Sequence, residues 1–311
     1  MIKTVIKSII PSSLYKFLRK NYYRFKNKPR VHLTNVFGFD LYQNNTDLDY
    51  TKFIGASFES PPLSPDGRIF SFMKLFLREG DVAIDVGANI GLMSLFMARI
   101  CGSSGKVISI EPGPVSSALL KRNLFVNGAL TTNAVLVNAA VSDFSGVIPL
   151  FLSAGGESDN QTHKGMESYE FRGELERLKI EVEAQMLDEI IFDNLGRFDR
   201  VGFIKIDTQG HEYYVIKGAS RVLSESTDIA VLCEYAPYLK SWEKIDVNEF
   251  FNLLKSFNFL IFDSNNIEFG KIDLDYLTAN FGFDKVGKYT DLLLVKGEAI
   301  IALKKKYINL I

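Results

Sequence analysis

The sequence predicts an α/β fold, in which the strands of a mostly parallel sheet alternate with helices that cover both of its faces. Three observations lead to this prediction. Short apolar runs that suit buried strands recur along the chain, most of them precede stretches with apolar residues at helical spacing, and acidic residues follow several of the runs directly. Because the carboxyl ends of parallel strands meet at one edge of a sheet, we expect a ligand site at that edge.

The individual elements follow from these patterns in chain order. Short alternating runs between 31 and 58 suggest a hairpin or an irregular lead-in. Strands are expected at 82–86, 106–110, 134–141, 201–206, 229–233, 259–262 and 290–295. Helices are expected at 69–77, from 92, from 114 to the Asn127-Gly128 stop, and at 187–195, 211–223 and 248–257. Two further strands, 146–152 and 178–184, flank a polar loop, which we expect to be a lid over the acceptor.

These elements divide the chain into three parts. Residues 59–297 form the main domain with the insert 146–184, residues 1–58 an N-terminal arm and lead-in, and residues 298–311 a basic and apolar tail. The formal net charge of −1 gives no overall field that would attract nucleic acid. Two cysteines are too few for a disulfide framework and favour a reducing, cytoplasmic setting.

The first thirty residues contain nine Lys or Arg residues and no Asp or Glu, interleaved with apolar residues. They could form a basic amphipathic helix, divided at Pro11, that lies on the anionic inner face of the membrane. The alternative is a helical arm that packs on its own domain or on a second subunit of a homodimer. No apolar stretch is long enough to span a membrane, since charged residues interrupt the best candidates.

The stretch from 82 to 91 predicts a buried strand, a glycine turn and the start of a helix. Gly87 and Gly91 are expected to let the backbone approach a ligand, and the helix N-terminus offers N–H groups. Asp85 would repel a phosphate, and Asn89 stands where a dinucleotide-binding fingerprint has a glycine. A cation suits this carboxylate better. S-adenosylmethionine carries an ammonium and a sulfonium group and no phosphate, so it is the expected cofactor.

The next strand ends at Glu111, whose carboxylate can accept hydrogen bonds from both ribose hydroxyls of such a cofactor. Ser142 and Asp143 follow the third strand and are expected to meet the adenine, although an Asx turn explains Asp143 equally well. Glu59 is expected to fold back over the ligand, and its alternative is a solvated loop position.

Acidic residues also follow the fourth and fifth strands, as Asp207 and Glu234. Asp207 stands where an acceptor would lose a proton, so it is the first candidate for a general base. His211, Glu212 and Glu234 are its rivals, although His211 and Glu212 could instead face the core or cap a helix. Together with Asp85, Glu111 and Asp143, these carboxylates are expected along one edge of the sheet.

Several motifs in these regions belong to one pattern. They are Ile84-Asp85-Val86-Gly87-Ala88-Asn89-Ile90-Gly91, Glu111-Pro112, Lys121-Arg122-Asn123, Asn127-Gly128, Ile204-Lys205-Ile206-Asp207 and Gly210-His211-Glu212. The chain from about Glu59 to Val295 thereby resembles the FkbM-type S-adenosylmethionine-dependent methyltransferases. One departure is Gln209, which replaces the middle acid of the family's Asp-x-Glu-Gly-x-Glu motif.

The resemblance implies a class I, Rossmann-like methyltransferase fold, whose seven-stranded sheet has an antiparallel last strand. It also implies methylation of a hydroxyl, often on a sugar, a glycan or a natural product. The expected cofactor-binding residues are Glu59, Asp85, Gly87, Ala88, Asn89, Gly91, Glu111, Pro112, Ser142, Asp143 and Asp207.

Other enzyme classes fit the sequence less well. The chain lacks the Asp/Asn-Pro-Pro-Tyr turn of amino-methylating enzymes, and it has Glu234-Tyr235 where metal-dependent catechol-type enzymes have Asp-Asn. A metal-free O-methyltransferase is therefore expected. The alternatives are an NAD(P)-dependent oxidoreductase, which Asp85 and Asn89 disfavour, and a protein that binds the cofactor or a membrane without turnover.

Overall fold

The computed structural model describes most of the chain from the first predicted strand onward. The described residues are 31–44, 57–60, 65–152, 160–162, 178–198, 201–237, 246–282, 284–285 and 287–307. Residues 1–30, on which the membrane and arm hypotheses depend, lie outside them. So does His163 of the insert, for which the sequence leaves open a part in catalysis or a solvated loop position.

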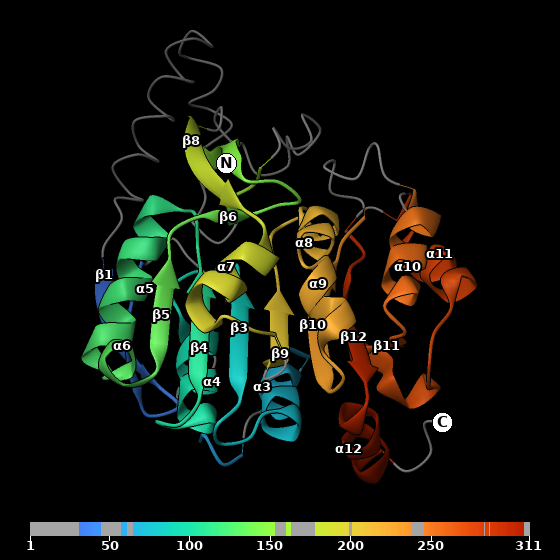
Figure 1. The fold of residues 1–311 in the computed structure, drawn as a ribbon, viewed down its shortest axis with the longest axis horizontal. Coiled ribbons are helices and arrows are strands. Elements are labelled where there is room, and N and C mark those ends of the chain that lie inside the picture. The colour runs from blue at the N-terminus through green and yellow to red at the C-terminus, as the bar shows by residue number, and fades with distance from the viewer. Residues whose placement is uncertain are drawn as a thin grey trace, which may run out of the picture.

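A seven-stranded sheet forms the centre of the fold, with the strand order β11-β12-β10-β9-β3-β4-β5 (Figure 1). The strands are β3 (Val82–Val86), β4 (Lys106–Ile110), β5 (Ala134–Val137), β9 (Val201–Ile206), β10 (Ile229–Tyr235), β11 (Leu260–Asp263) and β12 (Thr290–Lys296). β12 pairs antiparallel with both of its neighbours, and the other pairs in this sheet are parallel. This is the predicted class I arrangement.

Helices cover both faces of this sheet (Figure 1). One face packs against α3 (Pro65–Phe76), α4 (Leu92–Cys101), α5 (Pro114–Val126) and α12 (Glu298–Lys306). The other face packs against α7 (Leu187–Leu195), α8 (Glu212–Gly218), α9 (Ser220–Glu225), α10 (Val247–Ser256) and α11 (Leu274–Phe281). Residues of β3 alternate between the two layers, with Ile84 in one and Ala83 in the other. Burial on both faces explains why every residue of this strand except Asp85 is apolar.

The predicted lead-in is a hairpin of β1 (Val31–Val36) and β2 (Phe39–Asn44) that packs against α4 and α5. The guanidinium of Arg99 lies 3.8 Å from the centroid of the Phe39 ring and donates a hydrogen bond to the carbonyl of Phe37. Asn123 donates to the carbonyls of Tyr42 and Ile90, so one buried amide joins the hairpin to the turn after β3.

Three expected elements differ from the structure. The third strand divides into β5 and β6 (Ala140–Val141), and β6 belongs to a separate sheet with β7 (Gly146–Leu152) and β8 (Leu178–Gln185). The expected helix 211–223 divides into α8 and α9, where Gly218 packs tightly against the carbonyl of Ser142. Part of the expected tail forms α12, whose Leu303 is completely buried.

Shorter elements complete the fold. They are α6 (Ala129–Thr132) and a 3-10 segment, η5 (Ser264–Phe269). Among the described residues, no helix is long and apolar enough to cross a membrane.

Candidate functional site

In the turn after β3, backbone N–H groups donate hydrogen bonds to acceptors within the chain. Four of them have partners there: those of Gly87, Ala88, Asn89 and Gly91. Two donate to the carbonyl of Ile110 and one to the carboxylate of Glu111. A phosphate-binding turn keeps such groups free for its ligand. The bonding of these four groups argues against a phosphate-bearing cofactor, and the N–H groups expected from the helix that follows the turn remain a prediction.

The two glycines of the turn are required by close packing of the chain itself. At Gly87, where φ is +75°, a Cβ would lie 1.8 Å from the carbonyl oxygen of Asp207. At Gly91, where φ is +91°, a Cβ would lie 2.4 Å from the side chain of Leu120. Close packing of β3 with β9 and of the turn with α5 therefore requires both glycines. The approach of a ligand to their backbone, expected from the sequence, remains a prediction.

Asp85 lies inside the domain and not at its surface. Its side chain is 0% exposed, its Oδ2 accepts a hydrogen bond of 2.6 Å from Ser94, and its Oδ1 lies 3.5 Å from the ammonium of Lys205. A direct contact between Asp85 and the cofactor, which the sequence predicts, does not fit this burial. The ammonium of Lys205 already supplies the cationic partner of this carboxylate.

Glu111 has the geometry of a hydroxyl-binding group. Each carboxylate oxygen accepts one backbone N–H, from Asn89 at 2.9 Å and from Gly113 at 2.8 Å, and so retains a second acceptor position. Burial raises the pKa of this carboxyl to about 7, against the two N–H donors and Lys205, which lower it. Pro112, which follows it, is half-buried.

The predicted adenine end holds a chain of polar contacts. Ser142 Oγ lies 3.2 Å from the Nε2 of His211, and Thr162 Oγ1 lies 2.9 Å from its Nδ1. Asp143 forms an ion pair of 2.9 Å with Lys217 on α8. Both ring nitrogens of the buried His211 thus face hydroxyls, which fits a positioning role better than the catalytic role considered from the sequence.

Three residues of the insert lie beside this end of the site. Gln161 pairs with Phe151 of β7, and a Cβ on Gly113 would lie 2.9 Å from Asn160 Nδ2. Thr162 contacts His211 on the other side. The sequence predicts that the insert is an acceptor lid. Its described residues 160–162 instead lie near the residues expected to hold the ribose and the adenine.

Two carboxylates meet at the ends of β9 and β10. Asp207, whose side chain is 40% exposed, lies 3.4 Å from the ammonium of Lys205 and accepts a hydrogen bond of 3.0 Å from Gln209. The same amide donates to Glu234 over 3.3 Å. Gln209 has a φ of +54°, a strained conformation that directs its side chain between the two acids. Burial and the charges of Asp207, Glu212 and Asp291 raise the pKa of Glu234 well above its ordinary value.

Comparison with known proteins identifies the family. The sequence model described as "Methyltransferase FkbM domain" matches residues 85–270 of the chain. The chain belongs to the FkbM methyltransferase family. It is accordingly an S-adenosylmethionine-dependent methyltransferase, as the sequence predicts.

Individual relatives match only part of the chain, and at low sequence identity. Methyltransferase sdnD of Sordaria araneosa is 33% identical over 154 residues, which cover 43% of this chain and 59% of that protein. A probable cobalt-precorrin-6B C(15)-methyltransferase (decarboxylating) of Saccharolobus solfataricus is 24% identical over 162 residues, 51% of this chain and 79% of that protein. The crystal structure of the FkbM methyltransferase from Methylobacillus flagellatus aligns with a TM-score of 0.41 and 14% identity, over 73% of this chain and 53% of that chain.

The residues of this FkbM site fit the cofactor. Glu111 offers two acceptor positions to ribose hydroxyls, and the turn beside it offers none of its four bonded N–H groups to a phosphate. Among the described residues, no group donates a hydrogen bond to the buried Oδ1 of Asn89 in the same turn. An acceptor oxygen of this kind suits a ligand that carries hydroxyl or ammonium donors.

Glu212 stabilises the FkbM loop that follows β9, and its predicted catalytic role does not fit its position. Its side chain is 0% exposed, and its Oε1 accepts hydrogen bonds from the N–H and hydroxyl of Thr208 and from the N–H of Gly210. Burial raises its pKa. This burial and bonding favour a structural role of Glu212 in the loop over the catalytic role that the sequence considers.

Glu59 lies away from the other predicted site residues, so its predicted contact with the cofactor does not fit its position. Its side chain is 78% exposed and lies 3.9 Å from Lys74 in the last turn of α3. The ring of the neighbouring Phe58 lies 4.4 Å from that of Phe96, at a tilt of 37°, and under Arg99, in the second half of α4. That end of α4 points toward the amino ends of the strands, whereas the cofactor site is at their carboxyl ends.

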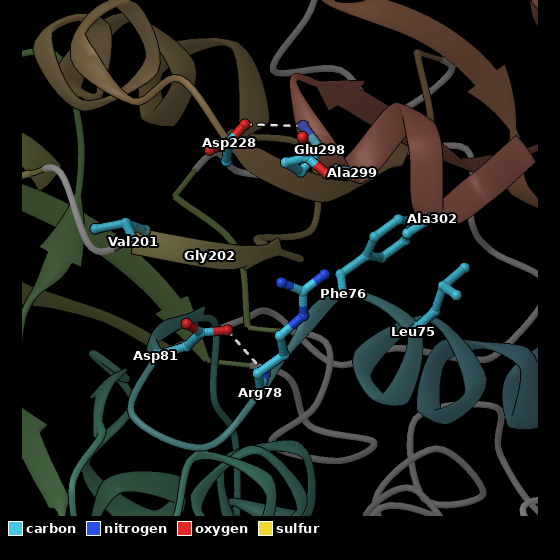
Figure 2. A pocket seen from close by; sticks show the side chains of 10 residues that line it. All are labelled: Leu75, Phe76, Arg78, Asp81, Val201, Gly202, Asp228, Glu298, Ala299 and Ala302. Carbon is cyan, nitrogen blue, oxygen red and sulfur yellow. Dashed lines mark hydrogen bonds between the residues drawn. The ribbon is translucent and has the colours of Figure 1, made fainter. Parts of the chain in front are cut away.

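A pocket of about 260 Å³ also lies at the amino edge (Figure 2). Arg78 points into it beside Gly202 at the start of β9, with Asp81 before β3 and Glu298 at the start of α12 (Figure 2). This pocket is therefore separate from the cofactor site.

The contacts of Lys205 with Asp85 and Asp207 were not predicted from the sequence. Their signals there were a lysine within an apolar strand and its place in the motif Ile204-Lys205-Ile206-Asp207. The described residues contain no group of His, Cys, Asp or Glu side chains that could hold a metal ion.

Proposed function

We propose that this chain transfers a methyl group to a hydroxyl oxygen of a sugar, a glycan or a natural product. The observation that carries the proposal is the carboxylate of Asp207. It stands at the carboxyl end of β9, it is 40% exposed, and two side chains, Lys205 and Gln209, hold its oxygens. Asp207 is thereby both accessible and fixed, as a general base requires.

The bound cofactor supplies a methyl group that is already activated on a sulfonium. The protein therefore has to hold an acceptor oxygen in line with that methyl group and exclude water, which can contribute roughly 7–11 kcal/mol. In the proposed step the acceptor oxygen forms a bond to the methyl carbon and the carbon–sulfur bond breaks, with its electron pair left on sulfur. Asp207 takes the hydroxyl proton, which contributes about 10²–10⁴-fold.

Glu234 supports a hydroxyl acceptor in a different way. The raised pKa favours the protonated form of Glu234, which can donate a hydrogen bond, while the carboxylate of Asp207 can accept one. A donor and an acceptor joined by Gln209 match a hydroxyl group, which needs one of each. An acceptor with several hydroxyls, such as a sugar, can use both.

The test uses S-adenosylmethionine with a labelled methyl group and a panel of neutral glycosides, glycans, natural-product alcohols and amines. We expect label on oxygen, and a loss of at least about 100-fold on Asp207→Asn. Glu59→Gln is the matched control and should retain activity, since this exposed glutamate lies away from the site. Label on nitrogen or carbon would refute O-methylation.

Two alternatives have distinct outcomes. If the protein binds the cofactor but transfers no label to any compound in a cell extract, this would support a protein that binds the cofactor without turnover. Calorimetric binding of NADH in preference to S-adenosylhomocysteine would support an oxidoreductase.

The setting of the reaction is a separate proposal that rests on the sequence alone. We propose a cytoplasmic enzyme whose basic residues 1–30 contact the inner face of the membrane. Flotation with anionic liposomes, compared with a variant that lacks these residues, tests the contact. Unchanged flotation of that variant would contradict it, and a change of oligomeric state instead would favour an arm that packs on a second subunit.

A further inference from the structure

Lys205 is a buried lysine whose ammonium reaches three oxygens at the carboxyl edge of the sheet. It pairs in register with Asp85 of the neighbouring strand. Its Nζ donates a hydrogen bond of 3.0 Å to the carbonyl of Gly87, and it lies 3.5 Å from Asp85 and 3.4 Å from Asp207. A buried ammonium is unfavourable unless it is paired and hydrogen-bonded, and these three oxygens provide both.

The two carboxylates that Lys205 contacts differ in accessibility. Asp85 is 0% exposed, and its oxygens face Lys205 and Ser94. Asp207 is 40% exposed, although it lies at nearly the same distance from the ammonium. Inside the domain the charge of Asp85 is therefore balanced by Lys205, and Asp207 carries the charge that faces outward.

We propose that Lys205 is a positioning residue, which balances Asp85 inside the domain and fixes Asp207 as the carboxylate that faces the sulfonium of the cofactor. This inference rests on the proposed role of Asp207 at the same site. It reassigns the recognition of the cofactor's positive charge from the acid of the β3 motif to the acid at the end of β9.

The proposal separates two kinds of support that Lys205 can give. If it only balances charge, then removing it together with the charge of Asp85 leaves Asp207 as it was. If it holds Asp207 in place through the 3.4 Å contact, then the same double change releases Asp207 although the net charge of the group is unchanged. Glu234 of β10 also interacts electrostatically with Asp207, and neither variant alters it.

The experiment compares the affinities of the folded protein for S-adenosylmethionine and S-adenosylhomocysteine by calorimetry at one pH, without an acceptor. The two ligands differ in the charge on sulfur. The ratio of their dissociation constants therefore measures how strongly a carboxylate of the protein attracts that charge. Asp207→Asn should reduce the preference for S-adenosylmethionine by about tenfold. Asp85→Asn should change it by less than about twofold, because that carboxylate does not face the ligand.

Lys205→Met alone leaves Asp85 buried without a partner and should lower the melting temperature or prevent folding. The double variant Lys205→Met with Asp85→Asn removes both charges and should fold. In that variant we expect the preference for S-adenosylmethionine to fall by at least about threefold toward that of Asp207→Asn. Lys205→Arg, which keeps the charge, should retain the wild-type ratio.

Lys106→Met is the matched control, because the Lys106 ammonium donates to the carbonyl of Asn194, away from the site. It should leave the ratio unchanged. A wild-type ratio in the double variant would overturn the positioning role of Lys205, and an equal loss in Asp85→Asn and Asp207→Asn would overturn the reassignment. Neither result depends on which acceptor is methylated, so failure of the proposed function is detected separately.

Discussion

The affinity of the enzyme for its cofactor should increase with pH through the titration of Glu111. The pKa of this carboxyl is raised to about 7, chiefly because it is buried. Ribose hydroxyls donate to the ionised carboxylate and so bind that form preferentially. About one tenth of the protein is ionised at this position at pH 6 and about nine tenths at pH 8, so the affinity should rise about tenfold over this interval.

The assay is calorimetry with S-adenosylhomocysteine at pH 6, 7 and 8, in two buffers with different enthalpies of protonation. At pH 6 binding should release nearly one proton, and at pH 8 almost none. Glu111→Gln should bind weakly and without this pH dependence, whereas Glu59→Gln should behave as the wild type. An affinity of the wild-type protein that stays constant from pH 6 to pH 8 would refute the assignment of Glu111 to the ribose.

The same shift also affects stability. The folded protein without cofactor binds a proton at Glu111 more tightly than the unfolded chain does, so this group stabilises the fold below about pH 4.5. Its contribution is lost as the pH rises through about 7. Denaturant unfolding of the wild type should therefore show a fall in stability over this range that Glu111→Gln lacks.

Three further predictions concern single residues. Gly87→Ala should destabilise the fold by more than about 3 kcal/mol in thermal unfolding, because its Cβ would overlap a main-chain oxygen. Gly128 has nearly the same φ and no atom within 4 Å of an added Cβ, so Gly128→Ala should cost about 1–2 kcal/mol. Glu212→Gln should retain methyl transfer, because an amide oxygen can accept the same hydrogen bonds, and a loss of activity there would restore Glu212 as a base. Thr162→Val removes the hydroxyl that faces His211 and should increase the dissociation rate of S-adenosylhomocysteine roughly fivefold in stopped-flow measurements. An unchanged rate would show that the insert does not contribute to cofactor binding.

The strands of the sheet could be predicted from the sequence because each of them carries its own signal. Val82, Ile84 and Val86 point into one helical layer and Ala83 into the other, so the strand is apolar at nearly every position. Glycines mark the turn that follows, whether they are needed for packing or for a ligand. Such local patterns identify strands and the turns at their ends without any knowledge of what packs on them.

The two divided elements were missed because their breaks depend on distant partners. β5 ends at Val137, and the next two residues to pair do so with β8, which lies about forty residues later in the chain. α8 ends at Gly218, where the helix meets the carbonyl of Ser142 at close range. Neither contact leaves a periodic signal near the break.

The roles of the acids could not be predicted from the sequence, because they depend on exposure. Asp85 and Asp207 both follow or end an apolar strand, yet one is 0% and the other 40% exposed. What separates them is Lys205, which stands between them on β9 and balances the inner carboxylate. Glu212 is also bonded within the chain, because its Oε1 accepts hydrogen bonds from two backbone N–H groups of its own loop. The side chain of Asp207 is 40% exposed, and each oxygen of Glu111 accepts only one N–H and keeps a second acceptor position. These are the two carboxylates that we propose for the acceptor and the cofactor.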